Sequence, residues 1–327
     1  MKRLAALALL VLLTAAANLT LAQGSSRLLV LNKEDATLVI INPASGAILG
    51  KVPVGQGPHE LVVSSDGKYA FASNYGTGPA PGSTISLIDI AGQKELRRID
   101  VSPLRRPHGL WFANGKLYFS AEADKKIARY DPATDKIDWQ FETGQNATHM
   151  VMLTKDGKTI LTSNIASGTV SVIQAGANGT FDQTVVPVGK GPEGIDIAPD
   201  GKTAWSAHSQ DGGVSVIDLA TRKVVSTINI GTKRSNRIKL TGDGKYALVS
   251  DLEAGELVVI DTAARKEIKR VKLGRSPEGV LIPPSGGVAY VAVNGDNHVA
   301  VIDLKTWTVA KTLETGGTGP DGMAWVP

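Results

Sequence analysis

Cysteine is absent from the 327 residues of this chain. Its absence excludes disulfides, thiolate metal ligands, cysteine nucleophiles and the covalent attachment of a c-type haem. It also excludes a lipid anchor attached through cysteine. A chain of this length does not need disulfide staples, because it is long enough to bury a large hydrophobic core.

Aromatic residues and excess charge are also scarce. Phe, Trp and Tyr make up 5% of the chain, and the formal net charge is only +4 at pH 7. Proteins that bind single-stranded nucleic acid combine a basic track with exposed aromatic side chains for stacking. Of the aromatic residues, only Tyr75, in the long loop 75–83, is expected near a binding surface. Nucleic acid is therefore a weakly supported partner.

Long apolar runs are missing except at the N-terminus. Lys2 and Arg3 precede an apolar run over residues 4–17, and Ala22 is the kind of small residue that precedes a cleavage point. The run is shorter than the roughly 20 apolar residues that a membrane span needs. We therefore predict a signal peptide over residues 1–22, cleaved near Ala22, and one mature domain over residues 23–327. The mature protein is expected to be periplasmic or secreted, with no membrane span.

What the chain does have is a repeat. One landmark is an apolar strand that ends in Asp, Asn or Gln, and its copies end at Asn42, Asp89, Asp131, Gln174, Asp218, Asp261 and Asp303. A second landmark runs in step with it, at Pro58-His59, Pro107-His108, Thr148-His149, Pro192-Glu193, Ser235-Asn236, Pro277-Glu278 and Pro320-Asp321. Successive copies of the first landmark lie 42 to 47 residues apart. Repeats of about this length are units that bury their core only against their neighbours.

Each repeat is interpreted as four strands. In the first repeat these cover residues 60–64, 68–74, 84–89 and 94–99, and Asp66-Gly67 forms the first turn. Asp-Gly between alternating segments is a strong hairpin signal, and four short strands per unit are typical of a propeller blade. Asp, Asn or Gln at the end of the third strand is interpreted as a turn residue that bonds the backbone ahead of it.

The two ends of the chain complete one blade. Residues 322–326 form a single strand, and residues 28–32, 37–42 and 48–52 form the three strands that it needs. Sharing a blade between both termini closes the ring and removes exposed strand edges. The sequence therefore predicts an all-β, seven-bladed β-propeller with four antiparallel strands per blade, its last blade closed by both termini. We expect a monomer.

The repeats resemble those of the Tyr-Val-Thr-Asn repeat family of β-propellers. The resemblance is carried by Tyr-Val-Ala-Val-Asn at 290–294, by residues 71–74 and 161–164, and by the Gly-x-Gly-Pro segments before the second landmark. It covers essentially the whole mature chain and implies a secreted or surface-exposed seven-bladed propeller. Relatives include surface proteins, proposed nucleic-acid binders and enzyme-like domains, so the resemblance assigns no activity.

The second landmark places seven polar residues at one mouth of the channel, because the first strand of each blade lines it. This ring consists of His59, His108, His149, Glu193, Asn236, Glu278 and Asp321. The three histidines, with Glu278 and Asp321, could hold a divalent ion of the Zn, Mn, Cu or Fe type. No cofactor is certain, because a propeller mouth is solvated and polar residues there need no function.

A second polar ring is expected where the second strands return to the same face. It consists of Asn32, Asn74, Glu122, Asn164, His208, Asp251 and Asn294. Such residues could orient the ligands of the first ring. The alternative interpretation is that the Asn side chains only bond neighbouring loops.

Cations are predicted around the same mouth, on the loops that lead into the ring. They are Arg105, Arg106, Lys190, Lys233, Arg234, Arg237 and Arg275. Together with Asn236 and Glu193 they suggest a site for an anionic ligand, since Arg pairs well with carboxylate and phosphate groups. The alternative is that these loop cations serve solubility.

Two functions follow from these patterns. The first is a binding or scaffold protein that recognises an anionic small molecule, a glycan or a protein partner at the mouth. The alternative is a metal-dependent lyase or lactonase, with His59, His108 and His149 as ligands or bases, completed by Glu278 or Asp321. Arg106 and Arg234 would then hold the anionic group of the substrate. Residues 107–110 and 118–122 are loosely similar to the streptogramin lyase repeat, over one blade only, so catalytic residues stay unassigned.

Overall fold

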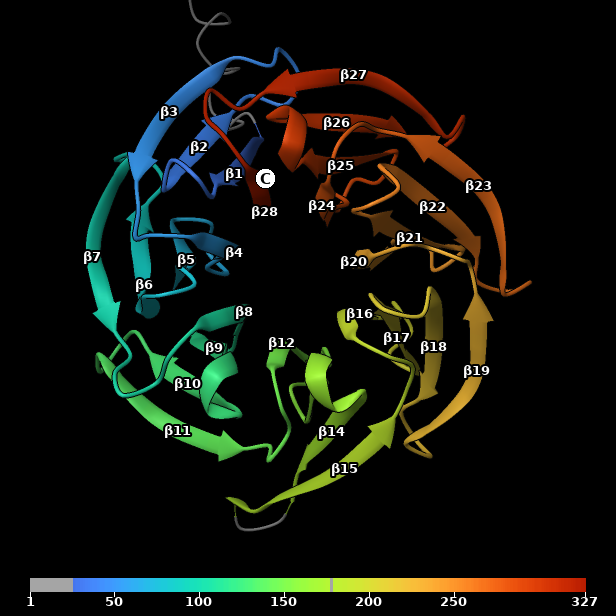
Figure 1. Ribbon diagram of the computed structural model, residues 1–327. Coiled ribbons are helices and arrows are strands. Elements are labelled where there is room, and N and C mark those ends of the chain that lie inside the picture. The colour runs from blue at the N-terminus through green and yellow to red at the C-terminus, as the bar shows by residue number, and fades with distance from the viewer. Residues whose placement is uncertain (1–25, 177–178) are drawn as a thin grey trace, which may run out of the picture.

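The chain folds into seven four-stranded antiparallel sheets around a central channel (Figure 1). The computed structural model describes residues 26–176 and 179–327, so the predicted signal peptide, residues 1–22, lies outside the described residues. The helical elements of the described part are short 3-10 turns, among them η1 (Glu122–Asp124), η2 (Ile165–Ser167) and η4 (Asn294–Asp296). None of the described helices has the length and apolarity needed to cross a membrane. The predicted seven-bladed propeller is confirmed.

We number the blades by their inner strands in chain order. Blade 1 consists of β4 (Pro58–Val63), β5 (Tyr69–Gly76), β6 (Pro81–Asp89) and β7 (Lys94–Asp100). Blade 2 consists of β8 (Pro107–Ala113), β9 (Lys116–Ala121), β10 (Lys126–Asp131) and β11 (Lys136–Glu142). Blade 3 consists of β12 (Thr148–Leu153), β13 (Thr159–Asn164), β14 (Thr169–Ala175) and β15 (Phe181–Pro187). Blade 4 consists of β16 (Pro192–Ile197), β17 (Thr203–His208), β18 (Gly213–Asp218) and β19 (Lys223–Asn229). Blade 5 consists of β20 (Ser235–Leu240), β21 (Tyr246–Asp251), β22 (Glu256–Asp261) and β23 (Lys266–Lys272). Blade 6 consists of β24 (Pro277–Leu281), β25 (Val288–Val293), β26 (His298–Asp303) and β27 (Thr308–Glu314).

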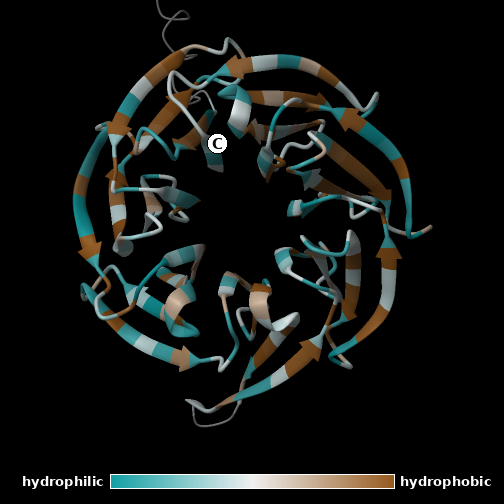
Figure 2. Cartoon of the chain, viewed as in Figure 1, coloured by the Kyte–Doolittle hydropathy of each residue, from teal (hydrophilic) through white to brown (hydrophobic). Residues whose placement is uncertain are grey.

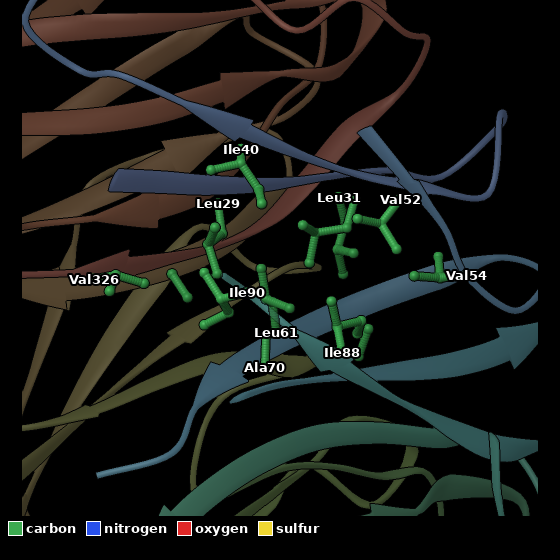
Figure 3. Packing of buried hydrophobic residues seen from close by; sticks show 13 residues of the cluster. Leu29, Leu31, Ile40, Val52, Val54, Leu61, Ala70, Ile88, Ile90 and Val326 are labelled. Atoms are coloured by element: carbon green, nitrogen blue, oxygen red, sulfur yellow. The ribbon is translucent and has the colours of Figure 1, made fainter. Parts of the chain in front are cut away.

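Blade 7 joins the two ends of the described chain. Its strand order is β28-β1-β2-β3, so the inner strand β28 (Pro320–Val326) pairs with β1 (Arg27–Asn32), followed by β2 (Thr37–Ile41) and β3 (Ile48–Pro53). Its face packs on blade 1 through a buried aliphatic cluster in which Leu29 and Leu31 approach Leu61 and Ile88 (Figure 3). Because both termini contribute to one sheet, unfolding either end opens the ring and exposes this cluster.

The turns form for the reasons that the sequence indicates. Gly67 adopts a positive φ of 71°, and Oδ1 of Asp66 accepts a hydrogen bond from the Lys68 amide at 3.1 Å. After the third strand of blade 7, Oδ1 of Asn42 accepts from the Ala44 amide at 3.0 Å. The turn interpretation of the Asp and Asn residues is confirmed at such positions. Among the outer strands, β11 alternates exposed and half-buried residues along its length, and hydrophobic and hydrophilic residues are interspersed in the outer strands (Figure 2).

The inner strands approach one another closely at the mouth. A Cβ on Gly279 would lie 2.2 Å from the carbonyl oxygen of Asp321, and a Cβ on Gly322 would lie 2.3 Å from that of His59. Glycine follows the ring residue there because no side chain fits between neighbouring blades. The pairing of each inner strand with its neighbour also shifts register at this level, for example between Pro58 and Leu61. Such bulges re-aim side chains, and here they aim the ring residues at the channel.

Candidate functional site

The mouth of the channel holds a cavity of about 560 Å³, which we call the mouth pocket. All seven residues of the predicted first ring line it, one from each inner strand: His59, His108, His149, Glu193, Asn236, Glu278 and Asp321. Further lining residues come from other positions, among them Lys33, Tyr75, Glu122, Lys233, Arg234 and Arg237. The repeat therefore predicts the ring, and the loops and second strands complete the pocket.

Histidines form one side of the mouth pocket, on blades 1 to 3. The ring centroids of His108 and His149 are 3.7 Å apart, those of His59 and His108 are 5.2 Å apart, and Tyr75 lies 4.7 Å from His59. The imidazole planes are tilted against one another, by 33° between His108 and His149 and by 60° between His59 and His108. Within residues 26–176 and 179–327, no group of three or more His, Asp or Glu side chains is placed to hold a metal ion. The residues predicted as ligands thus share a pocket without forming a ligand sphere.

Burial keeps two of these histidines neutral. Burial lowers the pKa of His59 to about 4, and the nearby Asp321 carboxylate only partly offsets that effect. Burial, with the neighbouring imidazole of His149, holds the pKa of His108 well below its usual value. At neutral pH both rings are therefore uncharged, and each offers one donor and one acceptor nitrogen.

His149 is oriented by a carboxylate. Its Nδ1 lies 2.7 Å from Oε2 of Glu122, whose Oε1 accepts a hydrogen bond from the Tyr75 hydroxyl, also at 2.7 Å. Burial would raise the pKa of Glu122, but the hydrogen bonds from His149 and Tyr75 hold it below its usual value. An ionised carboxylate only accepts hydrogen bonds, so Nδ1 of His149 is the donor in this contact. The buried Nε2 of His149 has no hydrogen-bond partner within the described structure.

Next to His59 along the ring, on blades 6 and 7, lies a cluster of two carboxyl groups and a lysine. Nζ of Lys33 lies 2.6 Å from Oε2 of Glu278 and 3.3 Å from Oδ2 of Asp321. Burial and the neighbouring Asp321 raise the pKa of Glu278. Burial acts in the same direction on Asp321, but Lys33 and Arg237 outweigh it and lower the pKa of Asp321. The pair therefore combines a carboxyl group that retains its proton with one that loses it easily.

Lys33 was missed by the sequence analysis, although a signal existed. It directly follows Asn32, the second-ring residue at the end of β1, and so stands at the same mouth. Burial alone would lower the pKa of Lys33, but Asp321 and Glu278 together raise it. The lysine is therefore a fixed positive charge between the two carboxyl groups.

Arg237 lies at the floor of the mouth pocket. The sequence analysis placed it on a loop, which is wrong: it is the third residue of β20, and it is buried. Its guanidinium forms an ion pair with Glu60 of β4, and its Nη1 donates a hydrogen bond to Oδ1 of Asn236 at 3.2 Å. Nδ2 of Asn236 in turn donates to Oε1 of Glu193 at 2.8 Å. Glu60, next to His59 in the sequence, was not predicted.

Only two of the other predicted cations reach the mouth pocket. Lys233 and Arg234 line it, they are exposed, and their side chains form no ion pair or hydrogen bond within the described residues. Their backbone amides donate to the carboxylate of Asp251, at 2.8 Å and 3.0 Å. A second-ring residue thus holds the loop that presents both cations.

The remaining four cations do not line the mouth pocket, so the predicted funnel of seven cations is wrong. Arg105 pairs with Asp124 and Arg275 pairs with Asp296, each at 2.7 Å. The guanidinium of Arg106 lies 4.6 Å from the centroid of the Tyr75 ring and donates to loop carbonyls. Lys190 does not reach the pocket either. A loop position close to the ring did not reveal where these side chains point.

The second ring is mostly structural. Nδ2 of Asn74 donates to the Thr84 hydroxyl at 3.0 Å, and Asn164 bonds hydroxyl groups of its own blade. His208 is buried, and its Nδ1 lies 3.0 Å from Oδ1 of Asp211. Of the second ring, only Glu122 lines the mouth pocket.

Comparison with known proteins adds a family and several solved structures. Residues 2–315 match the family described as "Lactonase, 7-bladed beta-propeller". A putative 6-phosphogluconolactonase from Bacteroides fragilis is similar with a TM-score of 0.77 at 18% identity, covering 94% of this chain and 99% of that one. Hydrazine synthase from Kuenenia stuttgartiensis is similar with a TM-score of 0.75 at 19% identity, covering 86% and 92%.

At these identities the solved structures show a shared fold alone. No curated protein matches the chain. The family match names lactonases, so the resemblance to the Tyr-Val-Thr-Asn repeat family stays a prediction.

Proposed function

The chain belongs to the seven-bladed β-propeller lactonase family, and we propose that it hydrolyses a lactone bearing an anionic group in the mouth pocket. The observation that carries this proposal is the His149–Glu122 pair, with Nδ1 2.7 Å from Oε2 and a buried Nε2 that has no hydrogen-bond partner in the described structure, on a residue that lines the pocket. The family match and this pair favour the lactonase alternative over the binding or scaffold function that the sequence analysis placed first.

His149 would act as the general base. With its proton on Nδ1 and directed at Glu122, its Nε2 can take a proton from water. The oxygen of that water bonds to the lactone carbonyl carbon, and the carbonyl electron pair moves onto its oxygen. When the tetrahedral intermediate collapses, the bond from carbon to the ring oxygen breaks and the protonated His149 returns the proton to that oxygen. Glu122 stabilises the imidazolium that forms between the two transfers.

The other groups of the pocket would bind and orient the substrate. Lys233 and Arg234 are the lining cations without an ion-pair partner in the described structure, so they are free to hold a carboxylate or phosphate at the rim. Glu278 retains its proton and could donate a hydrogen bond to a substrate oxygen. Lys33 and Arg237 are already paired with carboxyl groups and would supply fixed positive charge to the pocket floor.

A panel of lactones tests the proposal. We expect purified protein to hydrolyse sugar lactones, measured as acid release at constant pH. The kcat/KM should be highest for a lactone with a phosphate or carboxylate group, and about tenfold lower for its neutral counterpart, since one well-placed charge pair contributes about 1–3 kcal/mol. Hydrolysis no faster than the uncatalysed rate for every lactone would contradict the proposal. Saturable binding of the same compounds without turnover would restore the binding function.

Metal dependence is a separate question, because the mechanism above needs no metal. Elemental analysis of the untagged mature protein, beside the double variant His59→Ala/His108→Ala, tests the prediction made from the sequence. About one tightly held ion per chain, lost in the double variant, would support a metal site at these histidines. Because no three His, Asp or Glu side chains of the described residues are placed as ligands, we expect less metal than one ion per chain.

The location of the enzyme is also a proposal. The apolar leader over residues 4–17 supports export and activity in the periplasm or outside the cell. N-terminal sequencing of the exported protein should begin near Gln23. Retention of the leader on protein recovered from the cytoplasm would contradict this.

A further inference from the structure

A second cavity lies in the channel below the mouth pocket. It has a volume of about 170 Å³ and is lined by the later residues of the inner strands, among them Val62, Trp111, Met152 and Leu281. We call it the lower cavity. The mechanism proposed for the mouth pocket does not use it.

An ion pair separates the two cavities. Arg237 on β20 and Glu60 on β4 pair across the channel, because these two inner strands stand on opposite sides of it (Figure 1). Arg237 lines both cavities, whereas Glu60 lines the lower one. At the same level, other inner strands carry glycine, for example Gly279 and Gly322, which leaves room for the two long side chains. The pair is thus the floor of one cavity and the ceiling of the other.

The wall of the lower cavity is apolar, and its charges are neutralised. Besides Arg237 and Glu60, its one charged lining residue in the described structure is Lys239, whose Nζ lies 3.3 Å from Oδ1 of Asp196. The remaining wall consists of aliphatic, methionine and tryptophan side chains and glycine backbone. A wall without an unpaired charge favours an uncharged ligand over water or an ion.

Methionine is concentrated at this site. The chain has four methionines, and the three other than Met1 all line the lower cavity: Met150, Met152 and Met323. Methionine is flexible and polarisable, and it is used where a surface must adapt to apolar ligands. Its confinement to one cavity is an observation independent of the shape and charge of that cavity.

We propose that the lower cavity is a binding site for a small, uncharged apolar molecule about the size of a benzene ring. An apolar cavity of about 150 Å³ is enough to hold benzene or xenon. The ion pair above it keeps the ligand away from the charged mouth pocket, so this site is separate from the proposed lactone site.

The three methionines also provide the test. In protein carrying 13C-methyl methionine, the mature chain should give three methyl signals, and benzene should shift all three saturably. Benzoate, which has the same ring with a charge, should shift none of them. The variant Val62→Phe fills the cavity and should abolish the benzene shifts, whereas Val185→Phe, at an exposed position of the outer strand β15, should retain them.

Two results would overturn the proposal. One is the absence of saturable shifts in the wild-type protein up to the solubility limit of benzene; the other is shifts of unchanged size in folded Val62→Phe. If Val62→Phe does not fold, a wild-type crystal under xenon pressure decides: a xenon peak is expected between Trp111 and Met152, and its absence refutes the site. None of these measurements depends on lactonase activity, so the two proposals can fail separately.

Discussion

Two histidine–carboxylate pairs lie in this propeller, and they differ in whether the Nε2 atom of the histidine has a hydrogen-bond partner. His149 and His208 are both buried, and in each the Nδ1 atom contacts a carboxylate, Glu122 at 2.7 Å and Asp211 at 3.0 Å. Nε2 of His208 accepts a hydrogen bond from the Gly189 amide at 3.3 Å, whereas Nε2 of His149 has no partner in the described structure. The His208–Asp211 pair is therefore fully used in holding a loop. The His149–Glu122 pair leaves one ring nitrogen, Nε2, available for a substrate or water.

The same contrast applies to the cations. Arg275 lies outside the mouth pocket and is paired with Asp296, while Arg234 lines the pocket and is unpaired within the described residues. Residue type alone thus says little about function in this fold. Whether a charged side chain can bind a ligand depends on whether it already has an ion-pair or hydrogen-bond partner within the protein.

The largest effect is expected from replacing the two histidines in turn. His149→Gln should lower kcat for lactone hydrolysis by about 10²–10⁴-fold, the usual contribution of a general base. It also breaks the buried contact with Glu122, so the free energy of unfolding should fall by about 1–3 kcal/mol, as it should for His208→Gln. His208→Gln should leave kcat within about twofold and lower the free energy of unfolding by about 1–3 kcal/mol, because it breaks a satisfied buried network. Equal losses of activity in both variants would remove the distinction between the pairs.

A smaller effect concerns the pH dependence of stability. Because the pKa of folded His59 is about 4, the folded protein keeps this ring neutral while the unfolded chain takes up a proton below pH 6.5. The free energy of unfolding should therefore fall as the pH drops from about 6.5 to about 4. In His59→Gln this fall should be smaller by about 3 kcal/mol, measured by urea unfolding at a series of pH values. Identical pH profiles would show that His59 is more solvated than its burial indicates.

The smallest effect is expected at the rim. Arg234→Gln should raise KM for an anionic lactone by about tenfold with kcat nearly unchanged, since it removes one charge-assisted contact of about 1.5 kcal/mol. Added salt should weaken wild-type binding in the same direction. Arg275→Gln is the matched control, because that guanidinium is occupied by Asp296, and its KM should not change. A similar rise in KM in both variants would point to a general surface charge effect.

Much of the fold and part of the candidate site could be read from the sequence. The two landmarks correctly placed His59, Glu278 and Asp321 at one mouth, because residues at equivalent positions of equivalent strands face the same way. The same reasoning failed for Arg105 and Arg275. Their side chains are long, and an acidic neighbour on the same loop surface, not the register of a strand, decides where they point.

The sequence by itself determined the number of blades, the closure by both termini and the members of the first ring, because each follows from a pattern that repeats within one unit. Only the tertiary structure decided the contacts between units: Glu122 with His149, Lys33 with Glu278, and Arg237 with Glu60, which lie 27, 245 and 177 residues apart. A repeat fixes how each strand is oriented, but not which side chains from different blades meet across the channel. These contacts between blades depend on the radius of the closed ring and on the rotamers that burial allows. They determine which side chains are left without a partner in the protein and can bind a ligand.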